Sequence, residues 1–234
     1  MATYPDTYES ARMTAALQAA LPVMLGYVAI GIPCGILEDQ IGVGPLLAFV
    51  VSMTFYSGAG QFMVCNMVLA GQPLLTIAAS VSLVSTRQVL YSAAFSPYFS
   101  HTRRWLATLF SATVTDESFG VNLGRFAADA SWTPAHATLV NLLCMTSWGV
   151  SNALGSLVGS VVGVPVAVAS FAMTAIFICL AATQPHTPVT AVVMVAAALG
   201  VVVCKCAGLA GAGILVGAVV GVAAGLVAGE VGRR

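Results

Sequence analysis

Charged residues are scarce in this chain. Of its 234 residues only 7% are Asp, Glu, Lys or Arg, and the formal net charge is zero. A soluble globular domain carries about 25% charged residues, so this composition excludes an ordinary soluble protein. The sequence has no basic tract, which argues against nucleic-acid binding. Because 59% of the residues are hydrophobic and the mean hydropathy is +0.97, the sequence indicates an integral membrane protein.

Motifs for catalysis and for cofactors are also missing. The sequence contains no Gly-rich phosphate loop, which excludes nucleotide-driven pumping by this chain alone. Of its six cysteines, only Cys204 and Cys206 lie close together, and that pair lacks the further ligands of a zinc site. No serine and histidine are arranged as in a hydrolase. We therefore expect no enzymatic activity, no cofactor, no metal and no disulfide.

The hydrophobic residues occur in blocks of helix length, which predicts an all-α polytopic membrane protein. A polar N-terminal segment, residues 1–12, precedes a single transmembrane domain, residues 13–234. We expect seven or eight transmembrane helices, depending on whether the second block crosses the bilayer fully. A short similarity between residues 52–55 and 172–175 raises the hypothesis of an internal repeat. The blocks cover residues 13–37, 46–70, 74–95, 105–126, 137–162, 166–182, 189–204 and 209–229.

The middle of the second block, residues 55–62, is a poor continuous helix. It places glycines beside small and polar residues, namely Ser57, Gly58, Gly60 and Gln61. Broken helices in transporters expose backbone N–H and C=O groups near the membrane midplane, where these groups bind substrates or ions. The alternative is a close helix crossing through small residues. The polar atoms of Ser57 and Gln61 favour the first interpretation, because packing does not need them.

Three charged side chains lie in the interior of hydrophobic blocks, away from the block ends: Arg87 in the third, and Asp116 and Glu117 in the fourth. Left unpaired in the bilayer centre, they would cost about 8 kcal/mol together. Counted from Ser100, Arg87 lies 13 residues earlier and Asp116 lies 16 residues later. In a hairpin of two helices they would therefore differ in depth by about one turn. We predict an ion pair of Arg87 with Asp116 or Glu117. The pair either takes part in the function or is purely structural and holds the two helices together.

Glycines and prolines mark the remaining blocks. Pro22 and Pro33 predict that the first block kinks or breaks. Small residues spaced four apart predict close helix packing. They occur at Gly31 and Gly35, at Gly155, Gly159 and Gly163, and at five positions from Gly213 to Gly229. With eight full crossings, the basic residues divide four against three between the two sides, so the positive-inside rule does not orient the chain.

Three stretches together resemble the AzlC family of branched-chain amino-acid permeases. They are residues 55–62 (FYSGAGQF), Thr86-Arg87 with Leu90-Tyr91, and residues 115–119 (TDESF). The resemblance implies an exporter of branched-chain or related hydrophobic amino acids in the inner (cytoplasmic) membrane. It also implies that the chain is the large subunit beside a small AzlD-like membrane protein. The glycines of 155–163 and 213–229 are candidate docking faces for that partner.

On this interpretation the chain is a secondary transporter. Arg87 or the backbone N–H groups around Gly58 to Gln61 would bind the substrate carboxylate, and Asp116 or Glu117 its ammonium group. Asp116 and Glu117 are also the candidates for proton coupling. The predicted substrate site comprises Ser57, Gly58, Gly60, Gln61, Arg87, Tyr91, Asp116 and Glu117. A passive channel and a non-transporting assembly subunit remain as alternatives.

Overall fold

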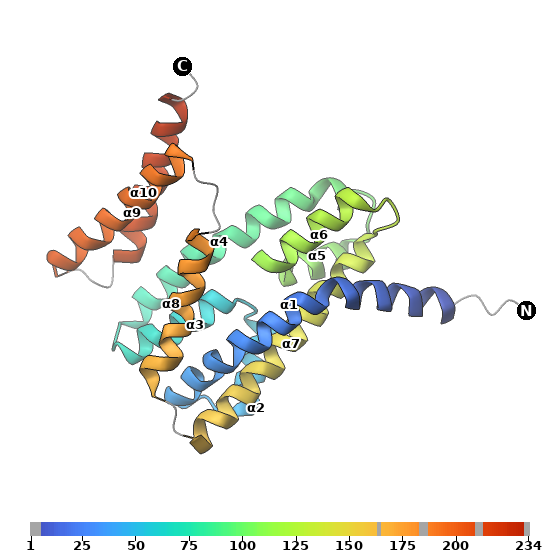
Figure 1. The fold of residues 1–234 in the computed structure, drawn as a ribbon, viewed down its shortest axis with the longest axis horizontal. Helices are drawn as coiled ribbons and strands as arrows, with labels where there is room; N and C mark the ends of the chain where they lie inside the picture. Colours follow the sequence, from blue (N-terminus) through green and yellow to red (C-terminus); the bar gives the residue numbers. More distant parts are fainter. Residues whose placement is uncertain (1–5, 163–164, 183–186, 209–212, 232–234) are drawn as a thin grey trace, which may run out of the picture. The chain divides into compact units, whose positions relative to one another are not determined.

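The computed structural model of the chain describes residues 6–162, 165–182, 187–208 and 213–231. Within these residues every regular element is an α-helix (Figure 1). The helices follow the predicted blocks, which confirms the all-α class. Their bounds are α1 Asp6–Gln40, α2 Pro45–Thr54, α3 Gly58–Leu69, α4 Leu74–Phe99, α5 Arg104–Thr113, α6 Asp116–Ala128, α7 Pro134–Val162, α8 Val166–Ala182, α9 Pro188–Cys206 and α10 Gly213–Val231.

Two compact units make up the chain. The first contains Met1–Asn66 and Val84–Met173, and the second contains Met67–Leu83 and Thr174–Arg234. The first unit therefore holds α1, α2, most of α3 and α4, α5 to α7, and the first part of α8. All the predicted site residues belong to it. The second unit contains the helical pair α9 and α10.

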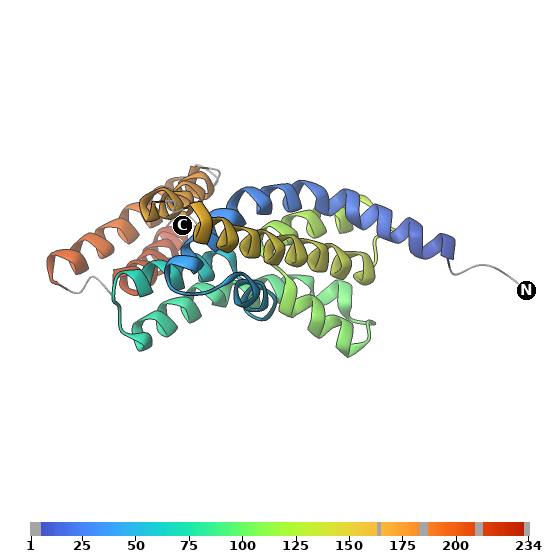
Figure 2. The same cartoon turned by 90° about the horizontal axis from the view of Figure 1, so that it is seen from below.

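Helices α1 and α7 form the centre of the first unit, lying side by side and running in the same direction (Figures 1 and 2). A Cβ atom on Gly35 would lie 2.0 Å from the carbonyl oxygen of Asn152, and one on Gly155 would lie 2.1 Å from that of Ile32. Only glycine permits this approach. The predicted packing role of the glycines is confirmed there, while Gly163 lies outside the described residues. Of the predicted kink or break in the first block, the break is wrong, since α1 continues through both prolines, and the kink stays a prediction.

The predicted break in the second block is confirmed. Helix α2 ends at Thr54, and α3 begins at Gly58. Across the break, the Gln61 Nε2 donates a hydrogen bond of 3.0 Å to Ser52 Oγ. Residues equally distant from the break are thus in contact, so α2 and α3 form an antiparallel hairpin. Its outer ends lie beside the C-terminal end of α1, where Cys65 is close to Glu38.

The fourth block was expected to be one continuous helix, and this prediction is wrong. The chain leaves the helix at Val114 and Thr115, between α5 and α6. A second hairpin results, because the Phe95 ring of α4 contacts Phe110 of α5 at 5.0 Å and Phe119 of α6 at 5.3 Å between centroids. No glycine or proline marks this break. Instead, Thr115 and Ser118 cap the start of α6 with reciprocal hydrogen bonds.

The outer ends of the second hairpin lie at the end of the first unit that is opposite the C-terminal end of α1. Tyr98, near the end of α4, stacks on Phe126 of α6 at 4.4 Å, and Arg125 lies over the Trp132 ring before α7. Arg12 of α1 is close to His136 of α7. We call this end the arginine end, because it carries Arg12, Arg103, Arg104 and Arg125.

The turn from α6 to α7 closes the arginine end. The Ser131 side chain and its backbone N–H donate hydrogen bonds of 2.6 and 2.8 Å to Asp129 Oδ1. These bonds lower the pKa of Asp129, so its carboxylate stays charged at neutral pH. A charged, exposed turn is consistent with an aqueous surface at this end.

The same succession of elements occurs twice in the first six helices. A long helix and a hairpin (α1, then α2 and α3) are followed by a second long helix and a second hairpin (α4, then α5 and α6). The two hairpins enter the first unit from opposite ends. The repeat predicted between residues 52–55 and 172–175 stays a prediction, because the side chains of residues 172 and 173 lie outside the description.

In the second unit α9 and α10 pack antiparallel through their small residues (Figure 1). A Cβ on Gly217 would lie 2.7 Å from Val201, and one on Gly225 would lie 2.8 Å from Val193. Most of the glycine series of α10 is therefore covered by α9, while Gly155 and Gly159 are covered by α1. The expectation that these glycines form docking faces for a partner is therefore wrong for the covered ones, whereas a Cβ on Gly229 would meet nothing within 4 Å.

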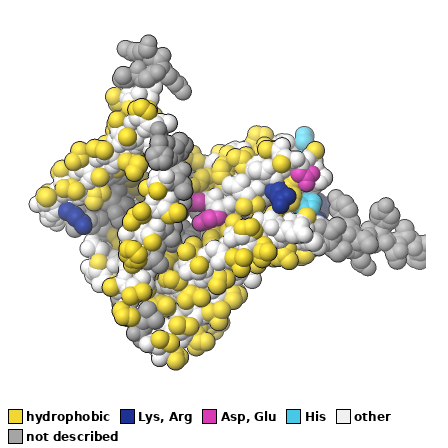
Figure 3. Space-filling model, in the orientation of Figure 1, with side chains coloured by type: hydrophobic (Ala, Val, Ile, Leu, Met, Phe, Trp, Pro, Cys, Tyr) yellow, Lys and Arg dark blue, Asp and Glu magenta, His cyan; other side chains and the backbone are white. Residues whose placement is uncertain are grey.

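Large apolar side chains cover much of the surface, and charged ones are few (Figure 3). Three described helices are long and apolar enough to cross a bilayer: Arg12–Gln40, Leu74–Phe99 and Pro188–Cys206. Shorter apolar helices include Pro45–Thr54, Gly58–Leu69 and Val216–Glu230. Seven or eight crossings are therefore not confirmed, and two of the predicted crossings are hairpins.

Candidate functional site

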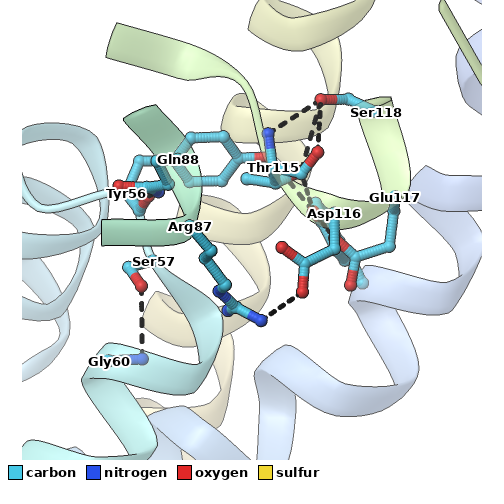
Figure 4. A network of polar contacts seen from close by, with 10 residues as sticks. Tyr56, Ser57, Gly60, Arg87, Gln88, Thr115, Asp116, Glu117 and Ser118 are labelled. Carbon is cyan, nitrogen blue, oxygen red and sulfur yellow. Dashed lines mark hydrogen bonds and ion pairs between the residues drawn. The ribbon is translucent and has the colours of Figure 1, made fainter. Parts of the chain in front are cut away.

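The tips of the two hairpins meet beside α1. Tyr56, in the first break, donates a hydrogen bond of 3.4 Å to the Tyr27 hydroxyl of α1. The same Tyr27 hydroxyl lies 2.8 Å from Thr115 Oγ1 in the second break. Figure 4 shows Tyr56 and Thr115 close to one another, with the polar side chains of α4 and α6 beside them. A single tyrosine on α1 thus contacts both helix breaks.

The predicted ion pair is present at this point. Arg87 of α4 donates a hydrogen bond from Nη1 to Asp116 Oδ2, at the start of α6 (Figure 4). Both side chains are partly accessible, with exposed fractions of 30% and 24%. Glu117 has a different partner, because the Tyr27 hydroxyl donates to its Oε2 at 2.8 Å. The structure therefore resolves the open choice in favour of Asp116 and leaves Glu117 on the exposed side of α6.

The start of α3 supplies backbone donors. The first intrahelical bond runs from Gln61 N to Ser57 O, so the N–H groups of Gly58 and Ala59 precede it. Gly60 N donates to Ser57 Oγ at 3.2 Å, which caps the helix. A Cβ on Gly60 would meet the Phe55 ring at 2.7 Å, and one on Gly58 would meet Trp148 at 3.3 Å. These glycines therefore let the chain turn tightly against aromatic rings.

Two other predicted site residues, Gln61 and Tyr91, contact side chains of neighbouring helices. Gln61 is only 2% exposed, and its Oε1 accepts a hydrogen bond from Trp148 Nε1 while its Nε2 donates to Ser52. The Gln61 amide thus joins α2, α3 and α7. The Tyr91 ring lies 4.7 Å from that of Phe119, between α4 and α6. The substrate-binding roles of the predicted residues stay predictions.

Sequence reasoning missed Tyr27, Thr115 and Gln88. Gln88 Nε2 donates to the carbonyl oxygen of Tyr56 at 3.2 Å, so α4 holds both hairpin tips through adjacent residues. The spacing of Thr115 and Ser118 is that of a capping box and could have revealed the second helix start. Tyr27 has no comparable signal, because it is a single polar group in a long apolar helix.

The site combines donors and acceptors of opposite charge in a small volume. The guanidinium of Arg87 and the N–H groups at the start of α3 are donors, and the carboxylates of Asp116 and Glu117 are acceptors. The two acids lie in the first turn of α6, where the helix dipole favours negative charge. In the described part of the chain, His, Cys, Asp and Glu form no group of three that could hold a metal ion.

Comparison with known proteins gives the family. The AzlC protein family matches residues 22–162, which include both breaks and the ion pair. The chain belongs to the AzlC family. This AzlC-family chain is 30% identical over 161 residues to an uncharacterized membrane protein of Helicobacter pylori, covering 68% of this chain and 70% of that protein. The family match over residues 22–162 confirms the family predicted from the three stretches, and this relative is named a membrane protein.

Two further relatives of this AzlC-family chain carry more informative names. It is 25% identical over 172 residues to the branched-chain amino acid transport protein AzlC of Bacillus subtilis, covering 72% of this chain and 66% of that protein. It is also 25% identical over 143 residues to the inner membrane protein YgaZ of Escherichia coli, covering 60% and 58%. No solved structure matches.

Proposed function

We propose that this AzlC-family protein is a secondary transporter that exports branched-chain or related hydrophobic amino acids across the cytoplasmic membrane. The observation that carries the proposal is the Arg87–Asp116 pair, which lies where two hairpin tips meet. Ionised groups within hydrophobic segments usually line a substrate or ion path. Asp116 directly follows the second helix break, and Gln88, next to Arg87, contacts Tyr56 in the first break. A pair beside two helix breaks favours a substrate path over a purely structural ion pair.

The chemistry of the site suits a zwitterion. The α-carboxylate needs a cation or backbone donors, which Arg87 and the start of α3 supply. The ammonium group needs an acceptor, for which Asp116 and Glu117 are the candidates. In the absence of substrate, Arg87 and Asp116 neutralise one another. An arriving amino acid exchanges this internal pair for two pairs with itself, so neither charge is left unpaired in apolar surroundings.

The lengths of the hairpin helices support re-entrance into the membrane from opposite sides. Helices α2 and α5 have 10 residues each. At 1.5 Å per residue, each is about 15 Å long, or about half of a 30 Å hydrocarbon core. Two re-entrant tips then meet near the midplane. Movement of one hairpin at a time would open the site to one side and then to the other, as alternating access requires.

The arginine end supports one orientation in the membrane. Arg12, Arg103, Arg104 and Arg125 all lie there, whereas residues 36–47 and 155–162 at the opposite end contain no Lys or Arg. Because cytoplasmic loops carry the excess of basic residues, the arginine end faces the cytoplasm. Lys205 belongs to the second unit, and Arg233 and Arg234 lie beyond the described residues, so none of them is counted. The hairpin of α5 and α6 is then the cytoplasmic one.

The family resemblance supports two further elements of the proposal. The protein works as a large subunit beside a small AzlD-like membrane protein, and it catalyses no chemical reaction. Efflux of labelled leucine, valine and methionine is measured in cells with and without this protein and a small partner. Saturable efflux that accelerates when external amino acid is present supports a transporter, whereas non-saturating flux indicates a passive channel. Equal efflux in both strains for every amino acid would refute the assignment.

A further inference from the structure

At the arginine end, three side chains pack together outside the site described above. The Arg125 guanidinium carbon lies 5.5 Å from the centroid of the Trp132 ring, and the His136 ring stacks on the same tryptophan at 5.0 Å. Charged and histidine side chains gather at this end on the face drawn in Figure 3. Arg125 belongs to α6 and His136 to α7, so Trp132, in the turn between them, contacts both helices.

Trp132 carries a buried donor without an acceptor. Its side chain is only 6% exposed, and its Nε1 atom has no hydrogen-bond partner in the described structure. The N–H of a buried tryptophan usually finds an acceptor, and a buried donor left without one is destabilising. An oxygen from outside the chain, of water or of a ligand, would satisfy this N–H.

The neighbours of this N–H are also donors. Arg125 brings a charged guanidinium group to the same ring. The backbone N–H of Thr133 donates to His136 Nδ1 at 3.3 Å, so the neutral imidazole carries its proton on Nε2 and donates there. A negatively charged acceptor suits such a set of donors better than a neutral one, because charge-assisted hydrogen bonds are stronger.

One carboxylate opposes an anion at this place. Asp129 is close to both Arg125 and His136, although Arg12 of α1 adds a second cation close to His136. The Asp129 Oδ1 atom accepts two hydrogen bonds from Ser131, so the carboxylate is held in the turn. Asp129 should therefore weaken the binding of an anion, and removing its charge should strengthen this binding.

The membrane surface supplies a suitable anion. Tryptophan is typical of the headgroup level, and basic pockets between membrane helices bind the headgroups of anionic lipids. We propose that Arg125 and the Trp132 N–H bind a phosphate group, and that its source is the headgroup of an anionic lipid. The Arg125 side chain is exposed, so it can move to bring a phosphate oxygen to the covered N–H. This site does not depend on the proposed transport function.

The first test measures binding of radiolabelled phosphatidylglycerol to the purified full-length protein in detergent. We expect unlabelled phosphatidylglycerol to compete much better than phosphatidylcholine. Trp132→Phe, which keeps a ring but removes the N–H, and Arg125→Ala should each weaken binding about tenfold. Trp105→Phe and Arg103→Ala are the matched controls, since Trp105 is 61% exposed and both residues lie outside the stack. Binding by Trp132→Phe and Arg125→Ala as tight as by these controls overturns the proposal.

The second test checks the sign of the charge effect. Asp129→Asn keeps the Oδ1 acceptor for Ser131 and removes the negative charge, so phosphatidylglycerol binding should become about two- to fivefold tighter. A purely structural role of this turn predicts no gain, and weaker binding by Asp129→Asn contradicts the proposal.

Inorganic phosphate distinguishes the two sources of the ligand. If millimolar phosphate leaves phosphatidylglycerol bound, the source is the lipid. If it displaces the lipid from wild type, the phosphate site stands and its ligand is free phosphate. If Trp132→Phe and Arg125→Ala match wild type with both ligands, the indole N–H meets only water and the proposal is wrong.

Discussion

The Tyr27 hydroxyl lies 2.8 Å from Thr115 Oγ1 and 2.8 Å from Glu117 Oε2. It joins the middle of the longest helix to the start of α6, which follows the second break. Tyr56 reaches the same hydroxyl from the first break. One phenolic oxygen of α1 therefore contacts both hairpin tips, which α4 also holds through Arg87 and Gln88.

Replacing Tyr27 by Phe should impair both transport and stability. The change leaves buried hydrogen-bonding groups unsatisfied, so we expect the free energy of unfolding to fall by about 1–3 kcal/mol. Thermal unfolding in detergent and leucine efflux measure the two effects. Tyr98→Phe is the matched control, because Tyr98 is 40% exposed and contacts Phe126 through its ring. Equal behaviour of the two variants would show that the Tyr27 hydroxyl does not organise the site.

Replacing Gly35 by Ala should separate α1 from α7. The new Cβ would lie 2.0 Å from the carbonyl oxygen of Asn152. We expect the free energy of unfolding to fall by about 1–3 kcal/mol, because the backbones must move apart. Gly26→Ala is the control, since a Cβ there meets nothing within 4 Å, and it should change stability by less than about 0.5 kcal/mol. A harmless Gly35→Ala would contradict the close approach of the two helices.

Single cysteines at His101 and Asp129 should react from the same side of the membrane. A hairpin of α5 and α6 returns the chain to the side from which it entered, whereas one continuous crossing would place these residues on opposite sides. Labelling with a membrane-impermeant maleimide in intact and permeabilised cells distinguishes the cases. The exposed Cys179 and Cys206 are first replaced by Ser.

The orientation follows from the same labelling experiment. The proposed orientation places the arginine end in the cytoplasm. We therefore expect His101→Cys and Asp129→Cys to react only after permeabilisation, and Gln40→Cys to react in intact cells. If His101→Cys and Asp129→Cys react from opposite sides of the membrane, α5 and α6 do not form a hairpin. The reverse pattern for all three variants would show that the protein has the opposite orientation in the membrane.

The sequence predicted where the helical blocks lie better than it predicted whether a block forms one helix or a hairpin of two. Hydrophobic blocks located α1, α4 and α7, and the glycines after Ser57 located the first break. A hydrophobic block of 22–25 residues can be one crossing or two half-length helices, and length alone does not distinguish them. The break at Thr115 was hidden because Val114 continues the apolar pattern. The Arg87–Asp116 pair was predictable because charges in an apolar segment need partners.

Tyr27 and Glu38 illustrate what the sequence could not reveal. A tyrosine in an apolar helix acquires its role only from three partners that lie 29, 88 and 90 residues away in the chain. Glu38 lies near a helix end, where the sequence is typical of an exposed turn. In the structure its side chain is only 2% exposed, which results from how the chain packs around the end of α1 and not from the local sequence.

Efflux of labelled leucine by the Asp116→Asn variant tests the central claim most directly, provided that unfolding in detergent shows the variant to be folded. The replacement keeps the size of the side chain but removes the negative charge that balances Arg87 and would receive the substrate ammonium. We predict a folded protein whose efflux falls to that of cells without the transporter. Efflux at the wild-type rate from folded Asp116→Asn would contradict the account, because the pair at the hairpin tips would then only fasten helices together.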